Sequence, residues 1–155
     1  MKRWIKIVLS VVVAVLVVAQ FIPMDRSVPE IDNSQDFLVA ENVPTEMATL
    51  IKGACYDCHS YNTRYPWYAK VAPLSFWIQK HINHGREELN FSVWATYEAD
   101  RAAHKLEECF EEVEEQHMPL SSYTWLHPEG QLSDAQRGAL VQWFQQQYRS
   151  MEGPQ

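Results

Sequence analysis

The first strong hydrophobic pattern is an apolar run from Ile7 to Ile22, which Pro23 ends. Its sixteen residues would form a helix of roughly 24 Å, slightly short of a full membrane span. Counting Trp4 and Ile5, with Lys6 reaching back to the surface, brings it close to the thickness of a bilayer. The run has no polar face, which argues against a helix within a soluble core. The pattern therefore predicts a signal anchor or transmembrane helix over residues 1–23.

Three cations, Lys2, Arg3 and Lys6, lie at the start of this segment and are typical of the end that stays inside the cell. An uncleaved anchor and a cleaved signal peptide would both place residues 24–155 outside the cytoplasm. The run is longer than the apolar part of a usual signal peptide, and no clear small-x-small cleavage site follows it. We therefore favour a single-pass anchor on the periplasmic side of the cytoplasmic membrane over a soluble periplasmic form.

Helical spacing dominates the rest of the chain, after a stretch over 24–42 that has no sustained period and is interpreted as a linker. Four segments each place their apolar residues on one helix face: Met47, Leu50, Ile51, Ala54, Cys55 and Cys58; Leu74, Trp77, Ile78, His81 and Ile82; Leu106, Cys109, Phe110 and Val113; and Leu140, Trp143, Phe144 and Tyr148. No stretch alternates convincingly as a strand. The fold class is therefore all-α, with about four helices in one domain over 43–150 and a C-terminal tail over 151–155.

Local signals predict where two of these helices begin or end. Gly85 is placed to cap the C-terminus of the second helix. Ser133 and Gln136 have the three-residue spacing of a capping box, which predicts the start of the last helix.

The charge balance narrows the class of partner. The formal net charge is -7, and three of the thirteen basic residues lie at the N-terminus. A nucleic acid is therefore not expected as a partner, whereas the acidic surface would suit a basic patch on another protein.

The strongest chemical signal is the run Cys55-Tyr56-Asp57-Cys58-His59, a C-x-x-C-H motif. Two cysteines three positions apart on a helical turn point their sulfurs the same way, so they can form thioethers to the two vinyl groups of one porphyrin. The histidine that follows is then held over the ring as an iron ligand. The motif predicts one covalent haem c, bound through Cys55, Cys58 and His59.

Three other uses of this cysteine pair fit the sequence less well. A zinc site needs a second pair of ligands at matching spacing, but the only other cysteine is Cys109. A thioredoxin-like motif needs a β-α-β context, which the helical pattern does not provide. A disulfide between Cys55 and Cys58 would close a loop too short to contribute much stability. Cys109 itself lies on an apolar face and is expected to be a small buried hydrophobe.

Met118, followed by Pro119, is the best candidate for the second axial ligand of the iron. It comes after the acidic helix, and the proline favours an extended loop that can lie against the ring. A thioether on the iron would raise the reduction potential relative to a second histidine. His81 is the main rival, although a lone histidine on an apolar face is more often a core residue. The other histidines of this part of the chain are expected to be exposed: His84, His104, His117 and His127.

Several residues are expected to support the haem. His59 should donate its outer ring nitrogen to a backbone carbonyl, for which the loop near Pro66 or Pro73 is the expected source. Arg64 or Arg86 is expected either to pair with a propionate or to be solvated. Six aromatic residues are expected in the core and the wall of the haem pocket: Tyr65, Trp67, Tyr68, Trp77, Trp94 and Trp125.

From Val43 to Tyr148 the chain also resembles the haem-binding-domain family of small, membrane-anchored bacterial c-type cytochrome-like proteins. The matching motifs are Cys55-Tyr56-Asp57-Cys58-His59-Ser60, Tyr65-Pro66-Trp67-Tyr68, Gly85-Arg86, Leu89-Asn90-Phe91-Ser92 with Trp94, and Met118-Pro119-Leu120 with Ser122-Tyr123. The resemblance implies a cytochrome c-like helical fold, thioethers at Cys55 and Cys58, His59 as an axial ligand, and Met118 as the distal ligand.

The first functional expectation is a monohaem one-electron carrier with His/Met ligation, tethered near a redox partner protein at the membrane. If Met118 is not bound to the iron, a haem-based sensor or small-ligand-binding module is the alternative. A peroxidase would need a distal acid-base residue, for which His81 and His117 are the candidates. Enzymatic activity thus stays open, and electron transfer or haem binding is favoured.

Overall fold

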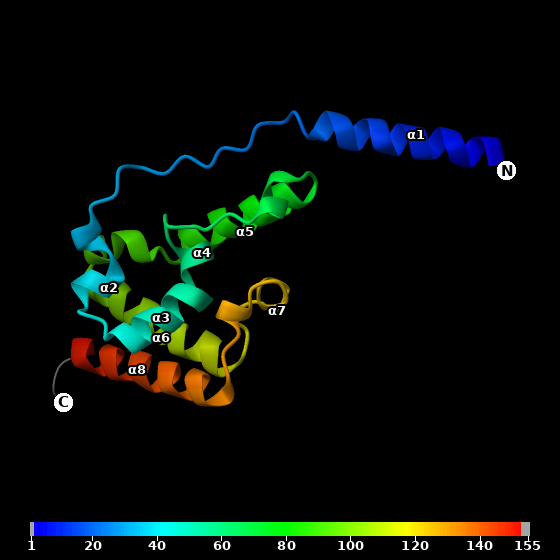
Figure 1. Ribbon diagram of the computed structural model, residues 1–155. Helices are drawn as coiled ribbons and strands as arrows, with labels where there is room; N and C mark the ends of the chain where they lie inside the picture. The colour runs from blue at the N-terminus through cyan, green and yellow to red at the C-terminus, as the bar shows by residue number, and fades with distance from the viewer. Residues whose placement is uncertain (1, 153–155) are drawn as a thin grey trace.

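The computed structural model describes residues 2–152, and these residues form helices and no strand, which confirms the all-α class (Figure 1). The α-helices are α1 (Lys2–Ala19), α2 (Phe37–Ala40), α3 (Thr45–Ala54), α4 (Tyr56–His59), α5 (Leu74–Glu88), α6 (Ala99–Glu114), α7 (Ser121–Thr124) and α8 (Asp134–Glu152). Short 3₁₀ helices are η1 (Asn33–Gln35), η2 (Trp67–Lys70), η3 (Phe91–Thr96) and η4 (Pro128–Gly130). Of these, α3, α5, α6 and α8 correspond to the four predicted helices, and the remaining short helices were not anticipated.

The N-terminal helix α1 leaves the rest of the molecule and ends at Ala19, before the predicted end of the segment at Pro23 (Figure 1). None of its residues is buried. Among residues 2–152, no helix combines the length and the apolar character needed to cross a membrane.

The folded domain begins before the expected boundary at Val43. Within the segment interpreted as a linker, Asp36 caps α2 by accepting a hydrogen bond from the Leu38 amide, and it also accepts one from the Tyr56 hydroxyl at 2.9 Å. Phe37 is fully buried, and its ring lies 4.7 Å from the Trp94 ring. A four-residue helix is too short to show a hydrophobic period, so the sequence pattern did not reveal this part of the core.

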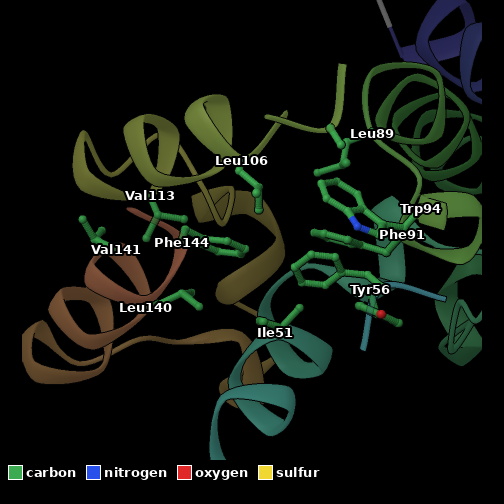
Figure 2. Close-up of a cluster of buried hydrophobic side chains, with 12 residues drawn as sticks. Ile51, Tyr56, Leu89, Phe91, Trp94, Leu106, Val113, Leu140, Val141 and Phe144 are labelled. Atoms are coloured by element: carbon green, nitrogen blue, oxygen red, sulfur yellow. The ribbon is translucent and has the colours of Figure 1, made fainter. Parts of the chain in front are cut away.

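The centre of the core is the interface between α6 and α8, which pack against each other more extensively than any other pair of elements. In Figure 2, Leu106 and Val113 of α6 face Leu140, Val141 and Phe144 of α8. The helical periods of these two segments predicted the contacting faces.

The second part of the core lies around α3, α4 and η3. Ile51 of α3 and Tyr56 of α4 belong to the same buried cluster as Phe91 and Trp94 of η3 (Figure 2). The rings of Tyr56 and Phe91 stack with their centres 5.3 Å apart. This packing fixes the segment from Cys55 to His59 between the two parts of the core.

The capping box is confirmed at the start of α8. The Ser133 amide donates to Oε1 of Gln136 at 2.9 Å, and the Gln136 amide donates to the Ser133 hydroxyl at 3.3 Å. At the other end, α8 continues to Glu152, so the expected tail over 151–155 is helical at its start, and residues 153–155 lie outside the described residues.

Gly85 does not end its helix, because α5 continues to Glu88. Instead, a Cβ at this position would lie 2.9 Å from the carbonyl oxygen of Cys58. The glycine therefore allows α5 to approach the C-x-x-C-H turn more closely than any other residue would permit.

We predict that Phe37→Ala lowers the free energy of unfolding by about 3–5 kcal/mol, because it leaves a cavity among the rings of the core. Val39→Ala, an exposed change in the same short helix, should cost within about 0.5 kcal/mol. Chemical denaturation of the two variants measures the difference. Equal, small effects would show that residues 33–40 are not part of the folded domain.

Candidate functional site

An apolar cavity, with a volume of about 350 Å³, brings together residues from five parts of the chain. Its lining consists of Ala54, Cys55, Cys58, His59, His81, His84, Gly85, Glu88, Leu89, Phe91, Glu108, Cys109, Glu112, Val113, Met118, Pro119, Leu120, Tyr123 and Phe144. All four residues predicted to bind haem are in this set. The structure therefore places Met118 at the same cavity as the C-x-x-C-H turn, although about sixty residues separate them in sequence.

The two cysteines of the motif lie at a break between two helices. α3 ends at Ala54, and Cys55, with φ of -123°, joins it to the single turn of α4. Both thiols are free and partly buried. Burial, with a smaller contribution from Cys58, raises the pKa of the Cys55 thiol to about 12. Burial, with Asp57 beside it, likewise raises the pKa of Cys58 to about 11, so both are protonated at neutral pH.

The surroundings of the pair bear on its other possible uses. A zinc site at Cys55 and Cys58 would need further ligands close by. Within residues 2–152, no group of three or more His, Cys, Asp or Glu residues is placed to hold a metal ion by itself. The same part of the chain contains no strand, so the β-α-β surroundings of a thioredoxin-like motif are missing.

His59 has one ring nitrogen fixed by the backbone. Nδ1 lies 3.2 Å from the carbonyl oxygen of Leu89, to which it donates in the Nδ1-protonated tautomer. Nε2 is then left unprotonated, which is the form that binds a metal. Burial lowers the pKa of His59, and this also favours the neutral ring. The prediction that this carbonyl comes from the loop near Pro66 or Pro73 was wrong. The chain that follows α5 places the Leu89 carbonyl against the His59 ring instead.

Asp57, between the two cysteines, is a buried carboxylate with several partners. Its side chain is about 8% exposed and accepts from Nε of Arg64 at 3.1 Å and from Nη2 of Arg64 at 2.9 Å. The backbone amide of Arg64 donates to it as well, at 2.9 Å. The Tyr123 hydroxyl lies 2.8 Å from Oδ2 of Asp57 and 2.9 Å from the carbonyl oxygen of Gly53, and it can donate to either. The C-x-x-C-H turn is thereby joined to the loop that follows Met118.

Met118 is held at the cavity by its backbone. Its amide donates to the Glu112 carbonyl at 2.9 Å, and its own carbonyl accepts from Nη1 of Arg137 at 2.8 Å. The same Arg137 nitrogen donates to the carbonyl of Val113 at 2.6 Å. Arg137 of α8 thus donates hydrogen bonds both to a backbone carbonyl at the end of α6 and to the carbonyl of Met118, at the start of the loop that follows.

The histidines divide into two groups. His81 and His84 line the cavity from α5, so His84 belongs to the site although its side chain is exposed as expected. Nδ1 of His81 lies 2.8 Å from the Trp77 carbonyl, which leaves Nε2 free. His104 and His117 are exposed beside glutamates of α6 and the segment that follows it, as expected. His127 was expected to be exposed but is partly buried, with its Nε2 3.2 Å from the Tyr68 hydroxyl.

Other expected supporting residues have different roles. Arg64 binds Asp57, and Arg86 donates to the Ser60 carbonyl at 2.8 Å and to the Thr63 hydroxyl at 2.9 Å, so neither lines the cavity. Cys109 packs against the core as expected and also lines the cavity, and burial together with Cys55 raises its pKa.

Of the six aromatic residues expected in the core and the pocket wall, Trp94 is buried in the core as expected. Trp67, Trp77 and Trp125 are exposed, Tyr65 and Tyr68 are partly buried, and none of the six lines the cavity. Phe91, Tyr123 and Phe144 provide the aromatic wall instead. Tyr123 belonged to a motif of the family resemblance but had no predicted role, and Arg137 had no local signal, because the partners of both come from distant segments.

The cavity fits a haem. Its volume lies in the range of cofactor pockets, and its surface is mostly apolar with a few polar groups. Two thiols and an imidazole with a free nitrogen lie on one segment, and a thioether reaches the cavity from another. This donor set matches the attachment and the axial ligands of a haem. The fold and the site thus define an all-helical protein with a cavity for a flat, iron-bearing macrocycle.

Comparison with protein families agrees with this class. The model of the haem-binding domain family matches residues 14–146. Because the match covers most of the chain, the protein belongs to the haem-binding domain family, and haem is its cofactor. No curated protein and no solved structure gave a significant match.

We predict that Tyr123→Phe lowers the free energy of unfolding by about 1–3 kcal/mol, because the buried Asp57 carboxylate loses a hydrogen-bond donor. Tyr61→Phe is the matched control, since the Tyr61 ring lies against Arg86 but its hydroxyl has no hydrogen bond among residues 2–152. Chemical denaturation compares the two. If both variants are equally stable, the link between Asp57 and the methionine loop does not contribute to the fold.

Proposed function

We propose that this protein is a monohaem c-type cytochrome that carries one electron outside the cytoplasmic membrane. The single observation behind the proposal is that Cys55, Cys58, His59 and Met118 all line one apolar cavity. Haem supplies the redox-active iron when it is bound. The protein's own residues attach it, orient it and set its surroundings.

Each of the four residues has a distinct role in this proposal. Cys55, at the junction of α3 and α4, and Cys58, within α4, would form the thioethers that attach the haem. His59 binds the iron through Nε2, because Nδ1 is engaged with Leu89. Met118 binds from the loop that Arg137 holds, and its thioether favours the reduced iron more than a second imidazole would.

The surroundings of the site favour electron transfer over substrate chemistry. The lining is mostly apolar, which limits the solvent reorganisation around the iron. The polar groups that line it besides the proposed ligands are Glu88, Glu108, Cys109, Glu112, His81, His84 and Tyr123. The nucleophile among them is the Cys109 thiol, and burial raises its pKa, so it is held in the unreactive protonated form.

The membrane location rests on α1. This helix exposes apolar side chains on all sides, which is unfavourable in water and favourable in lipid. Its cationic start suits the inner surface of the membrane, so the domain would lie on the periplasmic side. Such a tether keeps the domain at high effective concentration near a membrane-bound redox partner.

A haem-based sensor or a peroxidase is the second candidate, and His81 is the observation in its favour. His81 lines the cavity with Nε2 free, so it is available as an acid-base group or as a rival ligand. This function requires that the sixth position of the iron be open to a small ligand.

We expect the haem to stay with the polypeptide after denaturation, and Cys55→Ala/Cys58→Ala to lose it, because thioethers survive unfolding and axial ligation does not. Haem staining of denaturing gels measures this for protein made with a haem-attachment system. Cys109→Ala is the control and should retain the haem. Retention by the double variant would contradict covalent attachment through these cysteines.

We expect Met118→Ala to convert a low-spin reduced spectrum into a high-spin one that binds carbon monoxide, because the sixth ligand is removed. Met47→Ala is the control, since Met47 is partly buried but does not line the cavity. Absorption spectra of both oxidation states measure the change. A wild-type protein that already binds carbon monoxide favours the sensor or peroxidase, and conversion by His81→Ala instead identifies His81 as the ligand.

A further inference from the structure

One surface of the domain exposes several large apolar side chains that are not part of the haem cavity. Its members are Trp67, Val71, Leu74, Trp77, Trp125 and Leu126, here called the aromatic face. Trp67 is 78% exposed and Trp125 is 81% exposed. None of the six lines the cavity, so binding of haem there leaves them uncovered. Clusters of this kind mark a surface that contacts another phase or molecule.

The two halves of the aromatic face are joined by a hydrogen bond. Trp67 to Trp77 come from η2 and the start of α5, whereas Trp125 and Leu126 follow α7. The Tyr68 hydroxyl lies 3.2 Å from Nε2 of His127, which connects the residues next to Trp67 with those next to Leu126. Segments far apart in the sequence therefore contribute to one surface.

The aromatic face is also where the N-terminal helix meets the domain. The Gln20 side chain donates to the Ala72 carbonyl at 3.1 Å and accepts from the Ala72 amide at 3.0 Å. Arg26 donates to the Ala69 carbonyl and stacks 4.4 Å from the centre of the Tyr65 ring. Figure 1 shows α1 leaving the molecule from the end of α5 that carries this face. The apolar helix and the aromatic face are thus fixed next to each other.

The charge of this region differs from that of the whole chain. From Ser60 to Arg86 the sequence has four cations and no carboxylate, although the net charge of the chain is -7. Two of these cations, Lys70 and Lys80, are exposed and form no ion pair among residues 2–152. They lie three positions after Trp67 and Trp77, so these two exposed tryptophans each have an unpaired lysine close by in sequence.

We propose that the aromatic face rests on an anionic lipid surface beside α1. Tryptophan is favoured at the boundary between headgroups and acyl chains, and exposed lysines are attracted to anionic headgroups. The proposal rests on the membrane location proposed above and adds the orientation of the domain. It would hold Leu74 and Trp77 of α5 against the lipid, next to His81, whose ring lies 4.1 Å from that of Trp77 and which lines the haem cavity.

The test uses the full-length holoprotein reconstituted into liposomes of phosphatidylcholine and phosphatidylglycerol. A small fraction of a lipid with a photoactivatable group near its glycerol is included, and mass spectrometry maps the crosslinked peptides. We expect adducts on residues 65–80 and 121–131 at a level about tenfold above those on α6, whose acidic surface should stay away from the lipid. Adducts on α1 report separately on membrane attachment.

Two sets of variants separate the contributions. Lys70→Glu/Lys80→Glu should lower the adducts on the aromatic face roughly tenfold in anionic liposomes, because each lysine near the surface contributes several-fold to the attraction. Trp67→Ser/Trp125→Ser should lower them in both anionic and neutral liposomes. Val39→Ser, which changes an exposed apolar residue of α2, is the control and should leave them unchanged.

Adducts confined to α1 would overturn the proposal while leaving membrane attachment intact. Equal labelling of α6 and the aromatic face would also overturn it. The same holds if an added soluble redox protein, and not the lipid, covers the aromatic face and lowers its adducts. The haem spectrum is recorded on the same samples, so a failure of haem binding is distinguished from a failure of lipid contact.

Discussion

The site depends on the hydrogen bonds and the ion pair that the buried Asp57 carboxylate makes. A charge with so little exposure needs partners, and it obtains them from the Arg64 guanidinium, the Arg64 amide and the Tyr123 hydroxyl. These partners come from the loop after α4 and from α7, so satisfying one charge fixes three segments relative to one another. These contacts hold the turn that carries Cys55 and Cys58 in place, and they hold the Met118 loop with it.

Two further contacts complete the arrangement around this turn. Gly85 lets α5 lie directly against the Cys58 carbonyl, and the chain that follows α5 brings the Leu89 carbonyl to His59. On the other side, the packing of α6 on α8 positions Arg137, which holds the Met118 backbone. The cavity is thus the space between a packed helical pair and a turn fixed by polar contacts, which suits a tightly held haem.

The long helices were predictable because each shows an apolar face over several turns, and the start of α8 was predictable from Ser133 and Gln136. The early core residue Phe37 was missed, since a helix of four residues has no measurable period. Gly85 was misinterpreted because a glycine near a helix end serves equally well as a cap or as a point of close approach. Trp67, Trp77 and Trp125 were expected in the core or the pocket wall, because sequence alone does not distinguish a buried indole from an exposed one.

By itself, the sequence determined the helical class and the local chemistry of the C-x-x-C-H turn, because both depend on residues within a few positions of one another. It also suggested Met118, but only from its place after the acidic helix. The tertiary structure decided that Met118 reaches the same cavity, that Leu89 fixes His59 from 30 residues away, and that Tyr123 meets Asp57 from 66 residues away. Contacts between segments so far apart follow from how helices pack, and no local spacing encodes them.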